Sequence, residues 1–337
     1  MRILVVTQMW PGPQDPDLGI FVADVVRELR AAGHEVDVAG IDQRGGGPGK
    51  HARLSADAVR RARSFRPDAV FAHFLFPAGA AGAAAAAAVR APLVVMAHGT
   101  DVENARRSRA LAAATQGVLR RSAALIVNSR WLAQRLGPVP VPVEVIDCGV
   151  DLERFAPDAH EPARWDGPRP RFLCVGSLIE RKAVVELADA FAALGRGSLA
   201  FVGDGPLRPA LEGRPGVILA GRVAHDEVAR WLAACDVLCQ PSAREPFGQA
   251  ALEALAMGRP VVASTEGGPA EFVPPQAGVL VAPGDPRALT SALARAAALP
   301  NPAEAARAAA AEHDVRRQAA RMAEVLERAV AARRAGR

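Results

Sequence analysis

The pattern of apolar and polar positions predicts a strand, a helix and a second strand near the start of the chain. Residues 3–6 are all apolar, which is typical of a strand buried inside a parallel sheet. Residues 20–32 place apolar side chains at helical spacing, and Gly33 marks the end of that helix before a strand at 35–39. Strand, helix and strand in this order predict a β-α-β unit and therefore an α/β protein.

The alternation of short apolar runs with helical patterns continues and predicts two parallel sheets. Further strands are predicted at residues 69–74, 93–97, 125–128 and 143–146, and then at 171–175, 199–203, 217–220, 236–240, 260–263 and 278–281. Residues 160–170 are rich in proline and charge and lack periodicity, so they are expected to form a linker. We expect an N-terminal domain over 1–160, a C-terminal domain over 168–312 and a basic helix over 313–337. Two such doubly wound, Rossmann-like domains would face each other across a cleft.

The stretch 242–260 places two glutamates, Glu245 and Glu253, eight positions apart. Only good helix formers follow Gly248, so a helix should begin near that residue. The amides of residues 247–249 would then be unpaired donors at the positive end of a helix, which suits a phosphate group. Carboxylates accept hydrogen bonds, so the glutamates would bind hydroxyls on either side of the phosphate, as in a sugar nucleotide. A surface helix with two solvated glutamates is the alternative for an isolated pair.

Two histidines stand at the carboxyl ends of predicted parallel strands, where residues face the ligand crevice of an open α/β sheet. His73 lies near the end of the strand at 69–74, and His98 directly follows the strand at 93–97. His98 also opens the sequence HGTD, which brings a glycine, a hydroxyl and a carboxylate together. A lone histidine is usually structural, but this setting favours a ligand-binding role for His98.

Lysine is rare in this chain, and one lysine lies in a loop between a predicted strand and a predicted helix. Among 41 basic residues only Lys50 and Lys182 are lysines. At position 182 a compact, strongly hydrated ammonium would suit a leaving diphosphate, with chance placement at a helix start as the alternative. Lys50 ends the stretch 44–50, RGGGPGK, which lacks the required glycine and the Ser or Thr of a phosphate loop. We expect this stretch to be a flexible loop.

The stretch 242–260 resembles the E-x7-E signature of the retaining glycosyltransferases of family four, which have the GT-B fold. The likeness extends over most of the chain. It implies that Glu245 contacts the donor sugar, that Glu253 binds the ribose and that the amides of residues 247–249 hold the diphosphate. It also implies that His98 faces the donor sugar and that the last helix returns to the first domain.

The phosphate-binding loop of that family departs from its usual form here. The family pattern G-R-L-x3-K-G corresponds to residues 176–183, with Ser177 at the arginine position and Ala183 at the second glycine. The resemblance assigns Lys182 to the pyrophosphate, and Arg181 would supply the second positive charge.

Further segments complete the predicted donor site. Residues 221–223 resemble the loop beside the base, and Gly267-Gly268 with Glu271 resembles a glycine pair near the donor, although plain turns are an equal alternative. The catalytic residues are predicted to be Glu245, His98 and Lys182. The predicted donor-binding residues are Gly19, Gly176, Ser177, Arg181, Lys182, Gly203, Arg222, Val223, Glu245, Phe247, Gly248, Gln249 and Glu253.

Composition narrows the choice of partners. With 337 residues, half of them hydrophobic, the chain can form two domains with buried cores. The net charge of +5 favours anionic partners, but aromatic residues make up only 4% and tyrosine is absent, so nucleic acid is not expected. The arginines of a predicted helix at 55–66 are expected to form a solvated basic face, with docking to acidic lipid as the alternative.

The sequence contains no signal-peptide pattern and no apolar run that could span a bilayer, so we expect a cytoplasmic protein, with peripheral contact at the inner membrane face compatible with its basic helix. Its cysteines form no CxxC pair and are expected to be buried free thiols, with a zinc site at His225 as the alternative. No Asp-x-Asp follows a predicted strand, so neither a metal nor a cofactor is expected. The four cysteines are Cys148, Cys174, Cys235 and Cys239.

These observations predict a metal-independent, retaining glycosyltransferase that uses a nucleotide diphosphate sugar. Its acceptor would be a sugar, a lipid-linked molecule or a small molecule, in cell-envelope glycan, glycolipid or natural-product biosynthesis. A sugar-nucleotide epimerase on the same scaffold is an alternative, as is a non-catalytic protein that binds sugar nucleotides or anionic lipid. The nucleotide base, the sugar, the acceptor, the linkage position and the oligomeric state cannot be read from the sequence.

Overall fold

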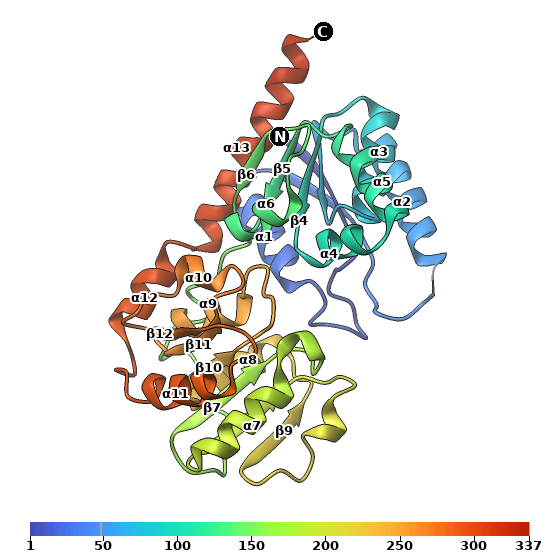
Figure 1. Ribbon diagram of the computed structural model, residues 1–337. Coiled ribbons are helices and arrows are strands. Elements are labelled where there is room, and N and C mark those ends of the chain that lie inside the picture. Colours follow the sequence, from blue (N-terminus) through green and yellow to red (C-terminus); the bar gives the residue numbers. More distant parts are fainter. Residues whose placement is uncertain (48, 337) are drawn as a thin grey trace. The chain divides into compact units, whose positions relative to one another are not determined.

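The computed structural model describes residues 1–47 and 49–336, which divide into two compact units (Figure 1). Unit 1 contains residues 1–149 and the segment that starts at Val315, and unit 2 contains residues 150–314. Pro48 of the predicted loop and Arg337 of the predicted last helix lie outside the described residues.

Unit 1 is built on a six-stranded parallel sheet with strand order β2-β1-β3-β4-β5-β6. Its strands are β1 (Arg2–Thr7), β2 (Glu35–Gly40), β3 (Ala69–His73), β4 (Leu93–Ala97), β5 (Ala124–Val127) and β6 (Val143–Val145). Its helices are α1 (Ile20–Ala31), α2 (Gly49–Phe65), α3 (Ala78–Val89), α4 (Thr100–Arg107), α5 (Arg109–Leu119), α6 (Arg130–Leu136) and α13 (Val315–Ala335). The strands lie close to the positions that the apolar runs predict.

Alternate side chains of the inner strands of unit 1 enter two separate cores, one on each face of the sheet. Leu4 and Val6 of β1 pack on one face with α2, α3 and α5, whereas Ile3 and Val5 pack on the other face with α1 and α13. Figure 1 shows α2, α3 and α5 on one side of this sheet and α13 on the other. Successive strand residues point to opposite faces, so a strand that is apolar at every position must be covered on both sides. The prediction of a doubly wound sheet is confirmed.

Unit 2 repeats this plan with strand order β12-β11-β10-β7-β8-β9. Its strands are β7 (Arg171–Val175), β8 (Ser198–Val202), β9 (Val217–Gly221), β10 (Val237–Gln240), β11 (Val261–Ser264) and β12 (Gly278–Val281). Its helices are α7 (Val184–Leu194), α8 (His225–Ala234), α9 (Gln249–Ala256), α10 (Pro269–Phe272), α11 (Pro286–Ala296) and α12 (Glu304–Ala311), with short 3-10 turns η1 (Glu180–Lys182) and η2 (Arg208–Ala210). Helices α8, α9 and α12 cover one face, and α7 and α11 cover the other.

Helix α2 begins at Gly49, so the predictions of a loop through Lys50 and of a helix starting at residue 55 are wrong in their boundary. Its buried residues Leu54, Ala58 and Ala62 recur every four positions and anchor the helix on the sheet. Lys50, Ala52 and Arg53 are good helix formers, and they extend the helix beyond the part that apolar periodicity can detect.

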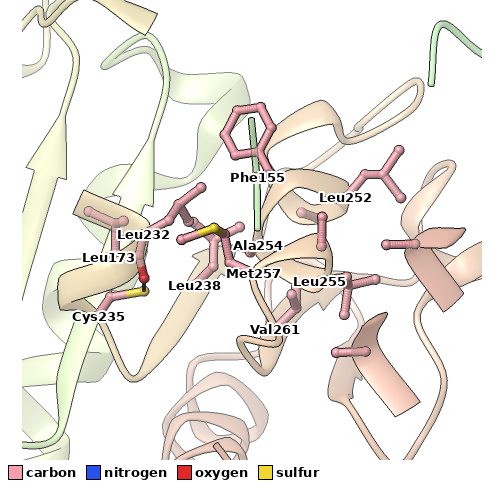
Figure 2. Close-up of a cluster of buried hydrophobic side chains, with 14 of the residues drawn as sticks. Phe155, Leu173, Leu232, Cys235, Leu238, Leu252, Ala254, Leu255, Met257 and Val261 are labelled. Atoms are coloured by element: carbon pink, nitrogen blue, oxygen red, sulfur yellow. Dashed lines mark hydrogen bonds between the residues drawn. The ribbon is translucent and has the colours of Figure 1, made fainter. Parts of the chain in front are cut away.

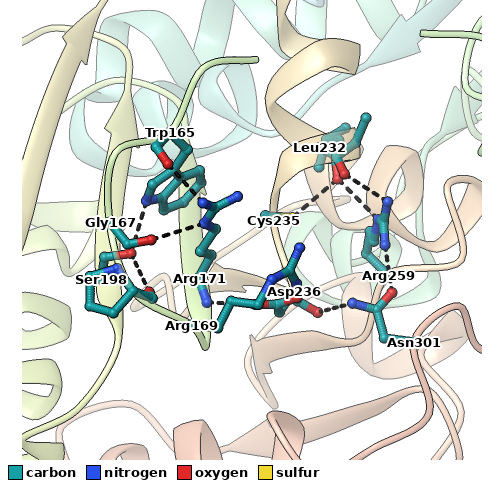
Figure 3. Close-up of polar contacts among 12 residues, drawn as sticks. Trp165, Gly167, Arg169, Arg171, Ser198, Leu232, Cys235, Asp236, Arg259 and Asn301 are labelled. Carbon is teal, nitrogen blue, oxygen red and sulfur yellow. Dashed lines mark hydrogen bonds and ion pairs between the residues drawn. The ribbon is translucent and has the colours of Figure 1, made fainter. Parts of the chain in front are cut away.

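The segment 150–170 belongs to unit 2, although the sequence suggested a domain boundary near residue 160 and a linker after it. Phe155 is buried in the core together with Leu252 and Leu255 of α9 (Figure 2). Trp165 is also buried and donates a hydrogen bond of 2.8 Å from Nε1 to Ser198 Oγ (Figure 3). Two isolated aromatic anchors hold a segment without regular structure, and such anchors leave no periodic pattern in a sequence.

Two further predictions concern the cysteines and membrane-spanning helices. All four cysteines are free and buried, as predicted. No helix within the described residues is long and apolar enough to cross a membrane.

Candidate active site

Glu245 lies in the loop between β10 and α9, and its carboxylate is almost fully buried in unit 2. Lys182 Nζ lies 2.5 Å from Glu245 Oε2, Ser242 Oγ lies 3.0 Å from it and Gln240 Nε2 lies 3.2 Å from it. All three groups donate to the same oxygen, so Oε1 accepts none of these bonds. A buried carboxylate is stable only when charges and donors compensate its lost hydration, and this set provides both.

The backbone of Glu245 is fixed by the segment after β11. Its amide donates to Glu266 O over 3.0 Å, and its carbonyl accepts from the amide of Gly268 over 2.9 Å. A Cβ atom at Gly267 would lie 2.0 Å from Glu245 O, and Gly267 has φ +152°, so a side chain there would collide with the loop. The glycine pair predicted near the donor therefore positions the glutamate backbone.

The electrostatic environment of Glu245 keeps it ionised. Burial disfavours the charged carboxylate, but Lys182, Arg181 and Ser242 outweigh burial and hold the pKa of Glu245 below its usual value. The Arg181 guanidinium lies 4.0 Å from Glu245 Oε2 and also donates to Arg244 O over 2.9 Å. Both cations of the loop 176–183 therefore gather at this glutamate.

The pairing of Lys182 with Glu245 was not predicted, because the sequence assigned the lysine to the phosphates alone. Lys182 ends η1, and its side chain is 15% exposed. Ser177, at the position of the family's arginine, is exposed at the start of the same loop. Residues Gly176 and Gly203 follow β7 and β8 and lie against each other through their backbones.

Glu253 lies on α9, 5% exposed, and its environment is different. His225 Nε2 lies 3.3 Å from Glu253 Oε1, and Arg154 Nη1 lies 3.3 Å from His225 Nδ1. Arginine can only donate, so His225 Nδ1 accepts and the histidine proton sits on Nε2, facing the glutamate. The ring edge of Phe155 packs on His225 at 5.5 Å between centroids.

The sequence missed His225 and Arg154 as neighbours of the site. Residues 221–225 form one segment, so the predicted base-side residues Arg222 and Val223 lead directly into the histidine that contacts Glu253. Arg222 is exposed, and Val223 is half-buried against the core. The alternative of a zinc site at His225 gains no support, because the described residues contain no group of three or more potential metal ligands. In the sequence, the one indication of this role was that His225 closely follows residues 221–223, the loop beside the base.

Helix α9 begins at Gln249 with Gly248 as its N-cap, as predicted. Gly248 has φ +98°, and a Cβ atom there would lie 2.6 Å from Pro269 Cγ. Phe247 buries its ring beside Phe272, 5.4 Å away. The start of α9 is therefore rigidly placed between the loop that carries Glu245 and the helix turn that carries Glu253.

His98 lies in unit 1, between β4 and α4, and is half-buried. The buried Asp101 carboxylate accepts backbone hydrogen bonds from Gly99 and Leu75 at 2.8 Å, from Val102 at 3.1 Å and from His98 at 3.2 Å. Burial raises the pKa of Asp101, and these amides oppose that shift. The carboxylate of HGTD thus shapes the turn through backbone amides and does not bind the His98 imidazole. Gly19, also in unit 1, is the N-cap of α1.

Two family models match this chain. Residues 169–298 match the model described as "Glycosyl transferases group 1", and residues 18–154 match the model described as "Glycosyltransferase Family 4". The two matches fall in unit 2 and mostly in unit 1, respectively.

The chain is also similar to known proteins in sequence and in structure. The chain is 28% identical over 256 residues to the putative teichuronic acid biosynthesis glycosyltransferase TuaC of Bacillus subtilis, covering 73% of this chain and 66% of that protein. It is 32% identical over 321 residues to a glycogen synthase of Mycobacterium tuberculosis, covering 88% of this chain and 72% of that protein. Its structure resembles Anabaena Alr3699/HepE in complex with UDP-glucose, with a TM-score of 0.73, 24% identity and coverage of 97% and 99%.

Proposed function

The chain belongs to the group 1 and family 4 glycosyltransferases of the GT-B fold, and from this premise we propose that it is a retaining enzyme that uses a nucleoside diphosphate sugar without a bound metal ion. The observation that carries the proposal is the arrangement around α9. An ionised, cation-paired Glu245 precedes the helix, and a second buried glutamate, Glu253, lies within it. This arrangement suits a ligand with a diphosphate between two hydroxyl-bearing groups.

In the proposed donor site, different residues bind the different parts of the nucleotide sugar. The first-turn amides of α9, together with Lys182 and Arg181, would hold the diphosphate. Glu253 would bind the ribose hydroxyls, with the segment 221–223 beside the base. Glu245, through the oxygen that its three donors leave unused, and His98 would bind hydroxyls of the transferred sugar.

The proposed reaction breaks the bond between the anomeric carbon and the diphosphate oxygen and forms a bond from that carbon to the acceptor oxygen. The acceptor proton passes to the departing phosphate oxygen on the same face of the sugar, so the anomeric configuration is retained. Negative charge grows on the diphosphate as the bond breaks, so Lys182 and Arg181 would stabilise the transition state more than the bound substrate. The sugar becomes oxocarbenium-like at the same time, and carboxylate and neutral imidazole neighbours do not oppose its positive charge.

The donor class is supported by HepE, which was solved with UDP-glucose. For this chain, we propose a nucleoside diphosphate sugar as donor and a sugar, lipid-linked or small-molecule hydroxyl as acceptor, in the synthesis of a glycan, a glycolipid or a natural product.

The proposal is tested by incubating the protein with single UDP, GDP, ADP and dTDP sugars and measuring released nucleoside diphosphate, with thermal stabilisation to find the preferred nucleotide. We expect turnover with at least one donor, unchanged by EDTA, and a product that keeps the donor's anomeric configuration by NMR. Loss of turnover in EDTA that magnesium or manganese restores would contradict the metal-free mechanism. An isomerised sugar would indicate an epimerase, and thermal stabilisation without turnover would indicate a binding protein.

A further inference from the structure

The buried ring of His73 has one hydrogen-bonded nitrogen and one without a partner in the described part of the chain. His73 ends β3, is fully buried and lies beside Thr7 of β1 and Met96 of β4 in the sheet register. Its Nδ1 lies 3.1 Å from His98 Nε2, and the two ring centroids lie 5.3 Å apart with 19° between the ring planes. Its Nε2 is buried and has no hydrogen-bond partner among the described residues.

The protons of this histidine pair can be counted. Burial lowers the pKa of His73 to about 3, and burial together with the neighbouring His73 places the pKa of His98 well below its ordinary value. Both rings are therefore neutral near pH 7, and each carries one proton. Of the two nitrogens that face each other, one must donate and the other must accept.

The unpartnered nitrogen decides between the two arrangements. If His98 donated from Nε2, the single proton of His73 would sit on its Nε2 as a buried N–H group without an acceptor. If His73 donates from Nδ1, its Nε2 carries only an unused lone pair. Buried N–H groups without an acceptor are rarer than buried acceptors without a donor, because an unpaired N–H group loses its only hydrogen bond. The second arrangement is therefore favoured.

We propose that His73 is a positioning residue, which donates its Nδ1 proton to His98 Nε2 and fixes His98 in the tautomer that carries its own proton on Nδ1. The rings of Phe21 and Phe74 lie 5.1 and 4.5 Å from the His98 ring and restrict its rotation further. The consequence for catalysis rests on the proposed function. His98 would present a neutral N–H group to a sugar hydroxyl oxygen and add no positive charge beside an oxocarbenium-like sugar.

The tautomer is measured directly on the wild-type chain with ¹⁵N-labelled histidine. Two-bond proton–nitrogen correlations distinguish protonated from bare ring nitrogens, and His98→Gln identifies the His98 signals by their loss. We expect Nδ1 of His98 to be protonated and Nε2 to be bare and hydrogen-bonded at pH 7. A proton on Nε2, or exchange between both forms, overturns the proposal. This measurement requires no substrate, so its outcome is independent of the proposed function.

A second experiment compares His73→Asn with His73→Phe. The Asn amide nitrogen can replace the Nδ1 donor, whereas Phe fills the space and donates nothing. We expect His73→Phe to lower kcat about tenfold, as loss of one hydrogen bond and of the tautomer allows, and His73→Asn to stay within about threefold of wild type. Affinity for the bare nucleoside diphosphate should be unchanged in both, because its proposed contacts lie in unit 2.

The matched control is His34→Asn, the same substitution at a histidine of unit 1 that contacts the N-terminus. It should leave kcat unchanged. Equal losses in His73→Asn and His73→Phe, or no loss in either, overturn the positioning role. If His73→Phe fails to fold, the Asn variant and its His98 nitrogen signals decide instead, since Asn must preserve the Nδ1-protonated tautomer. Absence of turnover in the wild type with every sugar nucleotide would refute the proposed function but leave the tautomer measurement valid.

Discussion

The two units place buried polar groups at the carboxyl ends of parallel strands in the same fold, but the groups differ in charge. In unit 1, the His73–His98 pair is neutral, and the nearby Asp101 is satisfied by backbone amides. In unit 2, Glu245 is paired with a lysine and lies near an arginine. One architecture therefore supports two kinds of site, and the difference comes from the residues at the strand ends rather than from the sheet.

This difference predicts unequal sensitivity to mutation. A buried charge that loses its partner carries the full cost of its lost hydration, whereas a neutral group loses one hydrogen bond of modest net strength. Substitutions in the charged set of unit 2 should therefore have larger effects than substitutions in the neutral set of unit 1.

The largest effect is expected for Lys182→Ala, which should lower kcat/KM at least about a hundredfold, the range typical of losing one electrostatic group at a transition state. Steady-state kinetics with the preferred donor measure it. Lys50→Ala is the matched control, because Lys50 donates to the carbonyls of Arg44 and Gly45 in unit 1 and should change almost nothing. Equal effects of the two substitutions would contradict the assignment.

The ion pair with Glu245 makes a double-mutant cycle informative. If Lys182 serves only to hold Glu245, removing Lys182 should not slow the Glu245→Gln variant any further. If Lys182 also contacts the diphosphate, its loss should slow the enzyme further in the Glu245→Gln background. We expect the second outcome.

The next effect separates the two glutamates, and each substitution should change its own parameter roughly ten- to a hundredfold, because hydrogen bonds to charged groups contribute about 1.5–3 kcal/mol. Glu253→Gln should raise the donor KM and weaken binding of the bare nucleoside diphosphate, since the ribose is unchanged in the transition state. Glu245→Gln should lower kcat and leave nucleotide affinity nearly intact. Calorimetry with the bare diphosphate decides the matter. Equal weakening by both substitutions would show that the pair acts as one nucleotide-binding or structural unit.

A pH titration of stability tests the neutrality of the unit 1 pair. The pKa of His73 is about 3 in the folded chain and near 6.5 when unfolded, so the unfolded chain binds the extra proton first. The stability contributed by neutral His73 is complete above pH 6.5 and falls by up to about 1.4 kcal/mol per pH unit below it. Urea unfolding of wild type and His73→Asn between pH 7 and 5 should therefore give a shallower slope for the variant. Parallel slopes would show that folding does not lower the pKa of His73.

The smallest effect is expected for His225→Ala. This substitution removes one hydrogen-bond donor from Glu253 and should weaken binding of the bare nucleoside diphosphate about fivefold, less than the loss of Glu253 itself, because His225 acts through the glutamate. Binding of a nucleotide that lacks the ribose hydroxyls should change less, because the lost donor acts through the glutamate. If both nucleotides weaken equally, His225 acts on the fold of α8 and not on Glu253.

The strands of both sheets could be predicted from the sequence, and the pairings within the site could not. A strand such as β4 is apolar at every position, and Pro92 before it and His98 after it mark its ends. Glu245 and Lys182 could be chosen singly, one from a family signature and one from lysine scarcity. Their contact joins residues 63 positions apart and depends on how β7 and β10 pair, which no local pattern encodes.

Other residues of the site are only weakly indicated by the sequence. Gln240 ends β10, and its position at the end of a parallel strand is the same signal that selected His98. Arg154 lies in a segment without periodicity, which the buried Phe155 holds in place. No sequence pattern therefore indicated this arginine. Side chains that act on another side chain, as Arg154 does on His225, become visible only when the fold brings them together.

Helix α13 constrains the order in which the two units can fold. It lies after all of unit 2 in the sequence, yet its Met322, Val325 and Leu326 complete the core of unit 1 beside Ile3 and Val22. At about 5–20 residues per second, the ribosome delivers this helix on the order of ten seconds after the rest of unit 1. During that interval the nascent first unit exposes an apolar sheet face, and at its end the second unit has every residue of its own core while the first unit still lacks α13. The second unit in the sequence can therefore be the first to fold, and a chain that stops before Val315 should aggregate rather than accumulate as an inactive enzyme.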